Sequence, residues 1–296
     1  MRIRIAAAAC SVAMPASFEA FARRIRMLLR MPLANGAQVI VLPEALALEL
    51  VTMLPEGQRR DPAIAFAALQ ELRSGWMRLF RAIAVEHGVT IVAGSFPVRT
   101  RGGRYRSRCD VFLADGGHVF QDKLHLTLGE KALGVIEPGD GFKVFDVHGV
   151  PMAIALGHDC LFPLSMRARC EAGARVLIVP ARVDRHADAL RTRVGCVAQA
   201  LENRCHVVLS LAAPESVLFN TESAVLAPIA DGFPGGGVQV SANDDWTIAD
   251  LDIAAGGRSV EQRRARDDPQ RQRSQRGADD RGREHVARVM QAQHHA

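Results

Sequence analysis

The sequence is poor in aromatic residues and in lysine. Aromatic residues make up 5% of the 296 positions, with one tyrosine and two tryptophans. Only three of the 37 basic residues are lysines, at Lys123, Lys131 and Lys143. A surface that stacks nucleic-acid bases needs aromatic side chains beside basic ones. The body of the chain has no such stripe, so we expect no specific nucleic-acid partner.

Metal-binding pairs and long apolar runs are also missing. The six cysteines form no CxxC pair, which excludes the zinc and redox motifs built on that spacing. His125 and His158 have no metal-ligand spacing, and we expect neither metal nor cofactor. No stretch of 18 apolar residues lacks a charge, so we expect no membrane-spanning helix. Most cysteines lie in apolar surroundings, which predicts buried thiols and a reducing, cytoplasmic location.

The net charge of +5 is concentrated at the C-terminus. Residues 258–296 hold ten arginines and six acids, which accounts for +4 of that total. Hydrophobic periodicity stops after Asp252, and residues 262–283 are mostly Arg, Gln, Asp and Gly. We therefore predict a folded domain over residues 1–257 and a disordered, Arg-rich tail over residues 258–296.

The N-terminus allows two interpretations. Arg2 and Arg4, followed by an Ala-rich run and Ala13-Met14-Pro15-Ala16, are similar to a secretory signal peptide. However, the apolar run is short and free cysteines suit a reducing compartment. These features favour a buried first strand over Ile3–Ala9, followed by a turn at Pro15.

Short apolar runs alternate with amphipathic segments along the rest of the chain. Strands are predicted over Val39–Leu42, Val89–Phe96, Val176–Val179, Cys205–Leu211, Ser223–Ala227, Gly237–Val240 and Thr247–Asp252. Helices are predicted over Phe18–Arg30, Ala63–Glu86, Leu164–Ala172 and Arg191–Asn203. Two hairpins, turned at Gly116 and Gly149, interrupt this alternation. Strand–helix–strand units mixed with hairpins predict an α/β fold with a mixed sheet or two packed sheets.

Polar residues follow three of the apolar strands. Glu44 comes after Val39–Leu42, Lys123 ends a hairpin strand, and residues 157–160 (Gly-His-Asp-Cys) follow another apolar run. Ligand sites in α/β proteins gather beyond strand ends, so these three positions are candidates for one site. Taken singly, each has an ordinary structural explanation as a turn residue, a helix cap or a solvated side chain.

Together, these segments resemble the nitrilase superfamily of carbon–nitrogen hydrolases. The resemblance runs from Arg2 to about Asp252 and keeps the order and separation of the motifs. The matching segments are Leu42-Pro43-Glu44, Asp122–Glu130, His158–Pro163, Glu171–Ala174, Val179–Ala181 and Ala198–Asn203.

The resemblance implies an αββα sandwich and a Glu–Lys–Cys site for small amides or nitriles. In that family a cysteine thiolate attacks the substrate carbon, and water then hydrolyses the thioester. Carried over by position, Glu44 is the general base, Lys123 stabilises the oxyanion and Glu130 is the second carboxylate. The resemblance also implies a homodimer or larger assembly and no cofactor.

The chain departs from the family pattern at the nucleophile. The pattern is Cys-Tyr-Asp-x-x-Phe-Pro-Glu, whereas residues 157–164 read Gly-His-Asp-Cys-Leu-Phe-Pro-Leu. Aligned without a gap, Gly157 stands at the nucleophile position, where it offers no reactive atom. Loss of a nucleophile costs the covalent route roughly 10⁴- to 10⁶-fold in rate.

Several interpretations of the site remain open. The chain is a weakly active or inactive hydrolase homologue, a non-catalytic binder of a small amide, nitrile or carboxylate, or a decayed copy. An active enzyme would need Cys160 as a substitute nucleophile or a water held by Glu44. His158, Asp159 and Arg191 are candidate ligand-binding residues, although Asp159 also suits a turn in which it accepts backbone N–H bonds. No recognisable pattern identifies the substrate.

Overall fold

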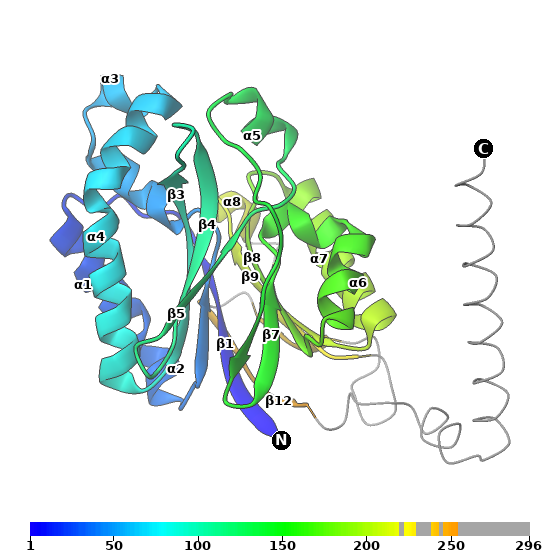
Figure 1. The fold of residues 1–296 in the computed structure, drawn as a ribbon. Coiled ribbons are helices and arrows are strands. Elements are labelled where there is room, and N and C mark those ends of the chain that lie inside the picture. The colour runs from blue at the N-terminus through cyan, green and yellow to red at the C-terminus, as the bar shows by residue number, and fades with distance from the viewer. Residues whose placement is uncertain (219–221, 229–237, 243–244, 254–296) are drawn as a thin grey trace, which may run out of the picture. The chain divides into compact units, whose positions relative to one another are not determined.

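A computed structural model of the chain describes residues 1–218, 222–228, 238–242 and 245–253 (Figure 1). They belong to one compact unit, Met1–Ala255. The predicted tail over residues 258–296 lies outside the described residues. No helix in the described ranges is long and apolar enough to cross a membrane.

Six strands form the first half of a twelve-stranded sheet. Their order is β12-β1-β2-β3-β4-β5, with β1 to β3 parallel and the remaining pairs antiparallel. The strands are β1 Arg2–Cys10, β2 Val39–Leu42, β3 Thr90–Arg99, β4 Tyr105–Phe112, β5 His118–Asp122 and β12 Trp246–Asp252. The first strand is therefore part of the fold, as the preferred interpretation of the N-terminus predicts.

The other six strands repeat this plan in the order β6-β7-β8-β9-β10-β11, with β7 to β9 parallel. They are β6 Val144–Val147, β7 Val150–Ile154, β8 Val176–Arg182, β9 His206–Ala212, β10 Ser223–Leu226 and β11 Val238–Ala242. Ala9 and Cys10 at the end of β1 pair with β9 and join the two halves.

Helices cover the outer face of each half (Figure 1). On the first half, α1 (Phe18–Leu28) and α4 (Pro62–His87) pack against β1 to β3. On the second half, α6 (Pro163–Glu171) and α7 (His186–Asn203) pack against β8 and β9. Aliphatic side chains from both halves form a core between the sheets. The αββα sandwich implied by the resemblance is confirmed.

Several predicted boundaries need correction. The helix predicted over Phe18–Arg30 ends at Leu28, and a separate helix α2 covers Arg30–Ala34. Pro32 explains the break, because it has no N–H to donate to the carbonyl of Leu28. The apolar residues Val111–Leu113 predict the first strand of the hairpin turned at Gly116, but this strand, β4, begins at Tyr105, because Arg106 and Arg108 interrupt the apolar pattern.

The described residues also contain short helices that are not predicted from the sequence. They are the 3₁₀ helices η1 (Leu46–Met53) and η2 (Gly157–Leu161), and α3 (Glu56–Arg59), α5 (Leu128–Ala132) and α8 (Glu215–Leu218).

Candidate active site

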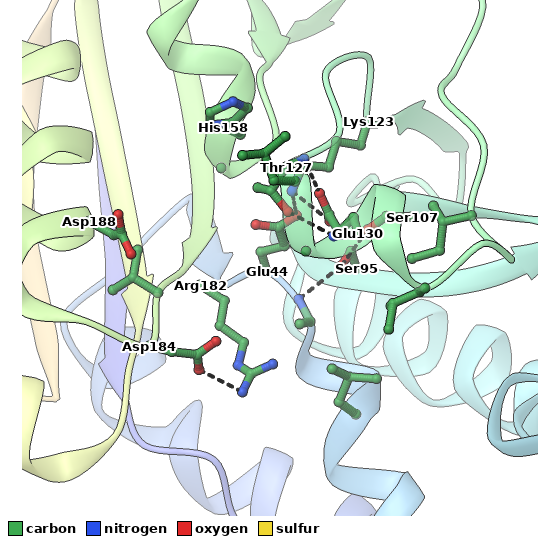
Figure 2. A pocket seen from close by; sticks show the side chains of 18 of the residues that line it. Glu44, Ser95, Ser107, Lys123, Thr127, Glu130, His158, Arg182, Asp184 and Asp188 are labelled. Carbon is green, nitrogen blue, oxygen red and sulfur yellow. Dashed lines mark hydrogen bonds and ion pairs between the residues drawn. The ribbon is translucent and has the colours of Figure 1, made fainter. Parts of the chain in front are cut away.

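A cavity of about 670 Å³ opens where several strands end (Figure 2). Its lining includes Glu44 after β2, Lys123 after β5, Gly157 after β7 and Arg182 at the end of β8. The volume falls in the range of ligand pockets. The three polar segments singled out in the sequence thus lie at one site.

The backbone around Glu44 is constrained from both sides. Ala45 adopts a left-handed conformation (φ 61°), and its N–H donates to Ser95 Oγ at 2.9 Å. Gly94 also has a positive φ, and a Cβ there would lie 2.2 Å from the carbonyl oxygen of Pro43. Only glycine at position 94 lets β3 lie this close to the backbone of Pro43, the residue before Glu44. These contacts fix the segment that carries Glu44 against the rigid sheet.

Lys123 connects two carboxylates at the back of the cavity. Its Nζ lies 2.8 Å from Glu44 Oε1 and 2.8 Å from Glu130 Oε1 (Figure 2). Lys123 and Glu44 are almost fully buried. The triad of Glu44, Lys123 and Glu130 is therefore an ion cluster in which each charge depends on its neighbours.

Glu130 is held in place by the first turn of α5. Its backbone N–H donates to Thr127 Oγ1 at 3.1 Å, and its Oε2 accepts from the N–H of Thr127 at 2.8 Å. This reciprocal capping box leaves Oε1 for Lys123. The side chain is thereby oriented before any ligand arrives.

Burial controls the electrostatics of the triad. Desolvation raises the pKa of Glu44; Lys123 opposes this shift and Glu130 adds to it. Burial alone lowers the pKa of Lys123, but the two carboxylates outweigh it and raise that pKa overall. Two carboxylates share one ammonium, so the fully ionised triad carries one net negative charge.

Gly157 borders the triad at the first residue of η2. Its φ is +44°, and a Cβ built there would lie 2.3 Å from Glu44 Oε2. Real side chains do not approach this closely, so the Glu44 carboxylate occupies the space that a side chain at position 157 would take. Any substitution of Gly157 therefore requires Glu44 to shift.

Asp159 organises the backbone and lies outside the cavity lining. It is fully buried and accepts from the N–H groups of Leu124, His125 and Leu156 and from His125 Nδ1. The carboxylate thus ties the segment after Lys123 to the turn that contains Gly157. Its acceptor capacity is taken up by these bonds, so we assign it a positioning role rather than ligand contact.

Two other candidate residues line the cavity. The His158 ring packs edge-on against Phe162, with ring centroids 5.3 Å apart. Burial, followed by the nearby Lys123 ammonium, lowers the pKa of His158, so the ring is neutral near pH 7. Arg191 lies at the rim on α7 and is mostly exposed.

Cys160 does not face the cavity. It is fully buried in the core under α7, with Sγ 3.9 Å from the carbonyl oxygen of Thr192 and close to Gly195. It lies within η2, before α6 begins at Pro163. The 3₁₀ turn directs its thiol toward α7, and this geometry gives no support to Cys160 as a nucleophile.

Arg182 and two serines are cavity residues that the sequence interpretation missed. Arg182 directly follows the buried run Val176–Ala181, so a polar residue after an apolar strand would have identified it too. Ser95 and Ser107 lie within β3 and β4 and give no such signal; their hydroxyls are 3.1 Å apart. Among the described residues, no cluster of three His, Cys, Asp or Glu side chains is arranged to hold a metal ion.

Comparisons with known proteins agree with this architecture. A probable hydrolase of Bacillus subtilis, YhcX, is 30% identical over 194 residues, which span 66% of this chain and 37% of YhcX. Omega-amidase NIT2-B of Xenopus laevis is 23% identical over 181 residues, which span 58% of this chain and 62% of that protein. The chain therefore spans less than two thirds of the length of these curated relatives.

A solved structure shares the fold. A double mutant of the amidase from Nesterenkonia sp. AN1, in complex with acrylamide, superposes with a TM-score of 0.65 and 20% identity over 89% of this chain and 96% of that one. The carbon-nitrogen hydrolase family model matches residues 4–253, which include both sheets and the cavity. The chain therefore belongs to the carbon–nitrogen hydrolase family.

Proposed function

We propose that this chain binds a small amide, nitrile or carboxylate ligand at the triad and lacks the covalent route of its family. Lys123 would polarise the ligand carbonyl, with Glu44 and Glu130 holding the ammonium in place. The Nesterenkonia amidase was solved with acrylamide and the Xenopus relative is named an omega-amidase, so an amide is the ligand class that the relatives favour.

The observation that carries this proposal is the contact between Gly157 and Glu44. We assign Gly157 to the nucleophile position by its place in the motif, and Glu44 Oε2 fills the space beside it. No cysteine occurs among the described residues that line the cavity. A thioester forms only when a thiolate lies within attacking distance of the ligand carbon. The cavity contains a candidate base, Glu44, and a candidate oxyanion stabiliser, Lys123, but no thiol among its described lining residues, so we infer that this route is closed.

Slow hydrolysis by water is the catalytic alternative. Ionised Glu44 would accept a proton from a water that attacks the carbonyl carbon, while Lys123 stabilises the oxyanion. Collapse of this intermediate would break the C–N bond, and Glu44 would return its proton to the departing nitrogen, which leaves as ammonia. The raised pKa of Glu44 makes the carboxylate a stronger base when ionised and reduces the ionised fraction. We expect no more than trace turnover by this route.

Two substitutions separate these possibilities. Cys160→Ala is expected to leave both ligand binding and any ammonia release unchanged, because the thiol lies outside the cavity. Glu44→Gln is expected to reduce residual ammonia release by roughly 10²-fold or more, as for loss of a general base. The exposed Glu56→Gln is the matched control. Calorimetric titration and ammonia assays on short amides, N-carbamoyl acids and nitriles provide the measurements.

Robust wild-type turnover that disappears in Cys160→Ala would contradict the proposal and identify Cys160 as the nucleophile. Robust turnover that persists in Cys160→Ala but is lost in Glu44→Gln would show that a water-based hydrolase, rather than a silent binder, is the correct description.

We also propose that the chain forms a homodimer through α6 and α7 in a reducing, cytoplasmic environment. Leu164 on α6 is 84% exposed and Val194 on α7 is 66% exposed, and Leu190 and Leu201 on α7 are also exposed. Exposed apolar patches mark interaction sites.

Light scattering of the wild-type protein should give twice the chain mass of 32.1 kDa, and the Val194→Glu variant should have the monomer mass. A wild-type monomer would contradict the dimer.

A further inference from the structure

We propose that Cys170 and Cys205 are a site of reversible oxidation, at which a peroxide such as hydrogen peroxide links the two thiols as a disulfide. Cys170 lies in the last turn of α6, and Cys205 directly precedes β9. Neither residue lines the cavity that contains Lys123. The modification is therefore independent of the proposed function.

The fold brings these two thiols together. After Cys170 the chain turns at Gly173, whose φ is +107°, and enters β8. Because β8 and β9 are parallel neighbours, they begin at the same end of the sheet, and the N–H of His206 donates to the carbonyl oxygen of Arg175 at 3.1 Å. Cys205 belongs to the core that α6 and α7 cover, and Cys170 packs against that core. The two thiols are hydrogen-bonded to each other.

Cys170 has the features of a reactive thiol. It is partly exposed, whereas the other five cysteines are buried. The hydrogen bond from Cys205 lowers the pKa of Cys170; burial opposes this shift, and the guanidinium groups of Arg169 and Arg175 add to it. Peroxides react with the thiolate form of accessible cysteines in positively charged surroundings. Cys170 is therefore the thiol that we expect to be oxidised first.

Cys205 is suited to the second step. Its hydrogen bond to Cys170, followed by burial, raises the pKa of the Cys205 thiol, so it stays protonated beside the Cys170 thiolate. Its N–H donates to the carbonyl oxygen of Ala200 at 3.4 Å, and its Sγ lies 3.9 Å from the carbonyl oxygen of Gln199. Oxidation of Cys170 to a neutral sulfenic acid removes the negative charge that favours the Cys205 proton. Cys205 can then attack the sulfur that it already contacts.

The chemistry consists of two steps. The Cys170 thiolate attacks one oxygen of the peroxide, so that an S–O bond forms, the O–O bond breaks, and hydroxide leaves and takes up the former thiol proton as water. The Cys205 sulfur then attacks the sulfenic sulfur, and an S–S bond replaces the S–O bond. The sulfenic oxygen leaves as a second water with the Cys205 proton. The two sulfurs together lose two electrons, which reduce the peroxide to water.

A second thiol pair in the same chain provides a comparison. Cys160 and Cys196 are also hydrogen-bonded to each other, but both are fully buried. That hydrogen bond, followed by burial, raises the pKa of Cys196. We therefore expect this pair to stay reduced under conditions that link Cys170 to Cys205. In the described ranges no third His, Cys, Asp or Glu joins either pair in a metal-binding group, so a disulfide suits the exposed pair better than a metal ion.

The test treats the folded, full-length chain with hydrogen peroxide and analyses it by mass spectrometry under non-reducing conditions. We expect an intact mass lower by two hydrogens, proteolytic fragments joined through Cys170 and Cys205, and return to the original mass with dithiothreitol. Cys205→Ser should leave a sulfenic acid on Cys170 that dimedone traps, and Cys170→Ser should give neither product. Cys160→Ala is the control and should form the same linkage as wild type.

A second measurement needs only the wild-type chain and so does not depend on whether the variants fold. Iodoacetamide should alkylate Cys170 roughly 10-fold or more faster than any other cysteine, and prior treatment with peroxide should block this reaction. An unchanged intact mass, a linkage between any other cysteines, or addition of oxygen to Cys170 without a linkage would overturn the proposal. Equal alkylation of all six cysteines would also overturn it.

Discussion

Gly157→Cys is expected to convert this chain into a covalent hydrolase. The new thiol would lie beside Glu44, which can accept its proton, and beside Lys123, which can stabilise the oxyanion. Restoring a nucleophile to an otherwise complete site should raise ammonia release by roughly 10³- to 10⁵-fold over wild type. Intact-protein mass spectrometry should detect an acyl adduct at residue 157.

Any side chain at position 157 strains the backbone and displaces Glu44, so the control variant must have the same two effects. A non-glycine residue at a φ of +44° loses about 1–2 kcal/mol, and its Cβ requires Glu44 Oε2 to move away from 2.3 Å. The carboxylate is the end of a flexible side chain, so it can turn while Oε1 stays with Lys123. Gly157→Ala carries the same strain and steric demand without the thiol, and it should bind no acyl group.

Equal turnover by the alanine and cysteine variants would show that the effect comes from displacing Glu44 rather than from the nucleophile. If neither variant gains activity although both still bind the short amides, the assignment of position 157 is wrong.

Replacing Lys123 is expected to have the largest effect on stability. Lys123→Met leaves Glu44 and Glu130 facing each other without the ammonium, and Glu44 is almost fully buried. Breaking a buried ion cluster by removing one partner costs about 3–5 kcal/mol in the free energy of unfolding. Lys131 is exposed, so Lys131→Met is the matched control and should change the free energy of unfolding very little. Ligand binding through the carbonyl should be lost as well.

The defect of Lys123→Met should depend on pH. Burial already raises the pKa of Glu44 in the folded chain, and loss of Lys123 removes the main opposing influence. A carboxyl with a raised folded pKa stabilises the fold below its ordinary value of 4.5, and that stability is lost as the pH rises through the folded pKa. Urea unfolding should therefore show that Lys123→Met loses less free energy of unfolding, relative to wild type, at pH 4.5 than at pH 8. Adding Glu44→Gln should restore part of the stability at pH 8, whereas a pH-independent defect would contradict this electrostatic account.

The sequence predicts the sheet strands well because their signals are local. Val39–Leu42 and Val176–Val179 are short β-branched runs that continue in the structure as β2 and β8. Glu44 is identifiable for the same reason, since it comes just after the apolar run Val39–Leu42. Arg182 carries a similar signal, because it directly follows the buried run Val176–Ala181.

Features that depend on three-dimensional packing were not predictable. The 3₁₀ geometry of η2 directs the Cys160 thiol toward α7, and no sequence pattern distinguishes this turn from a helix start. The position of Glu44 Oε2 beside Gly157 depends on the approach of β3 to Pro43, which involves residues fifty positions apart.

The most direct test of the central claim is rapid-quench mass spectrometry of the wild-type protein with the amide panel, under conditions in which Gly157→Cys accumulates its adduct. We predict no acyl group on any of the six cysteines of the wild-type chain, together with measurable binding of the same amides. An acyl adduct on Cys160, or on any other wild-type cysteine, would contradict the account.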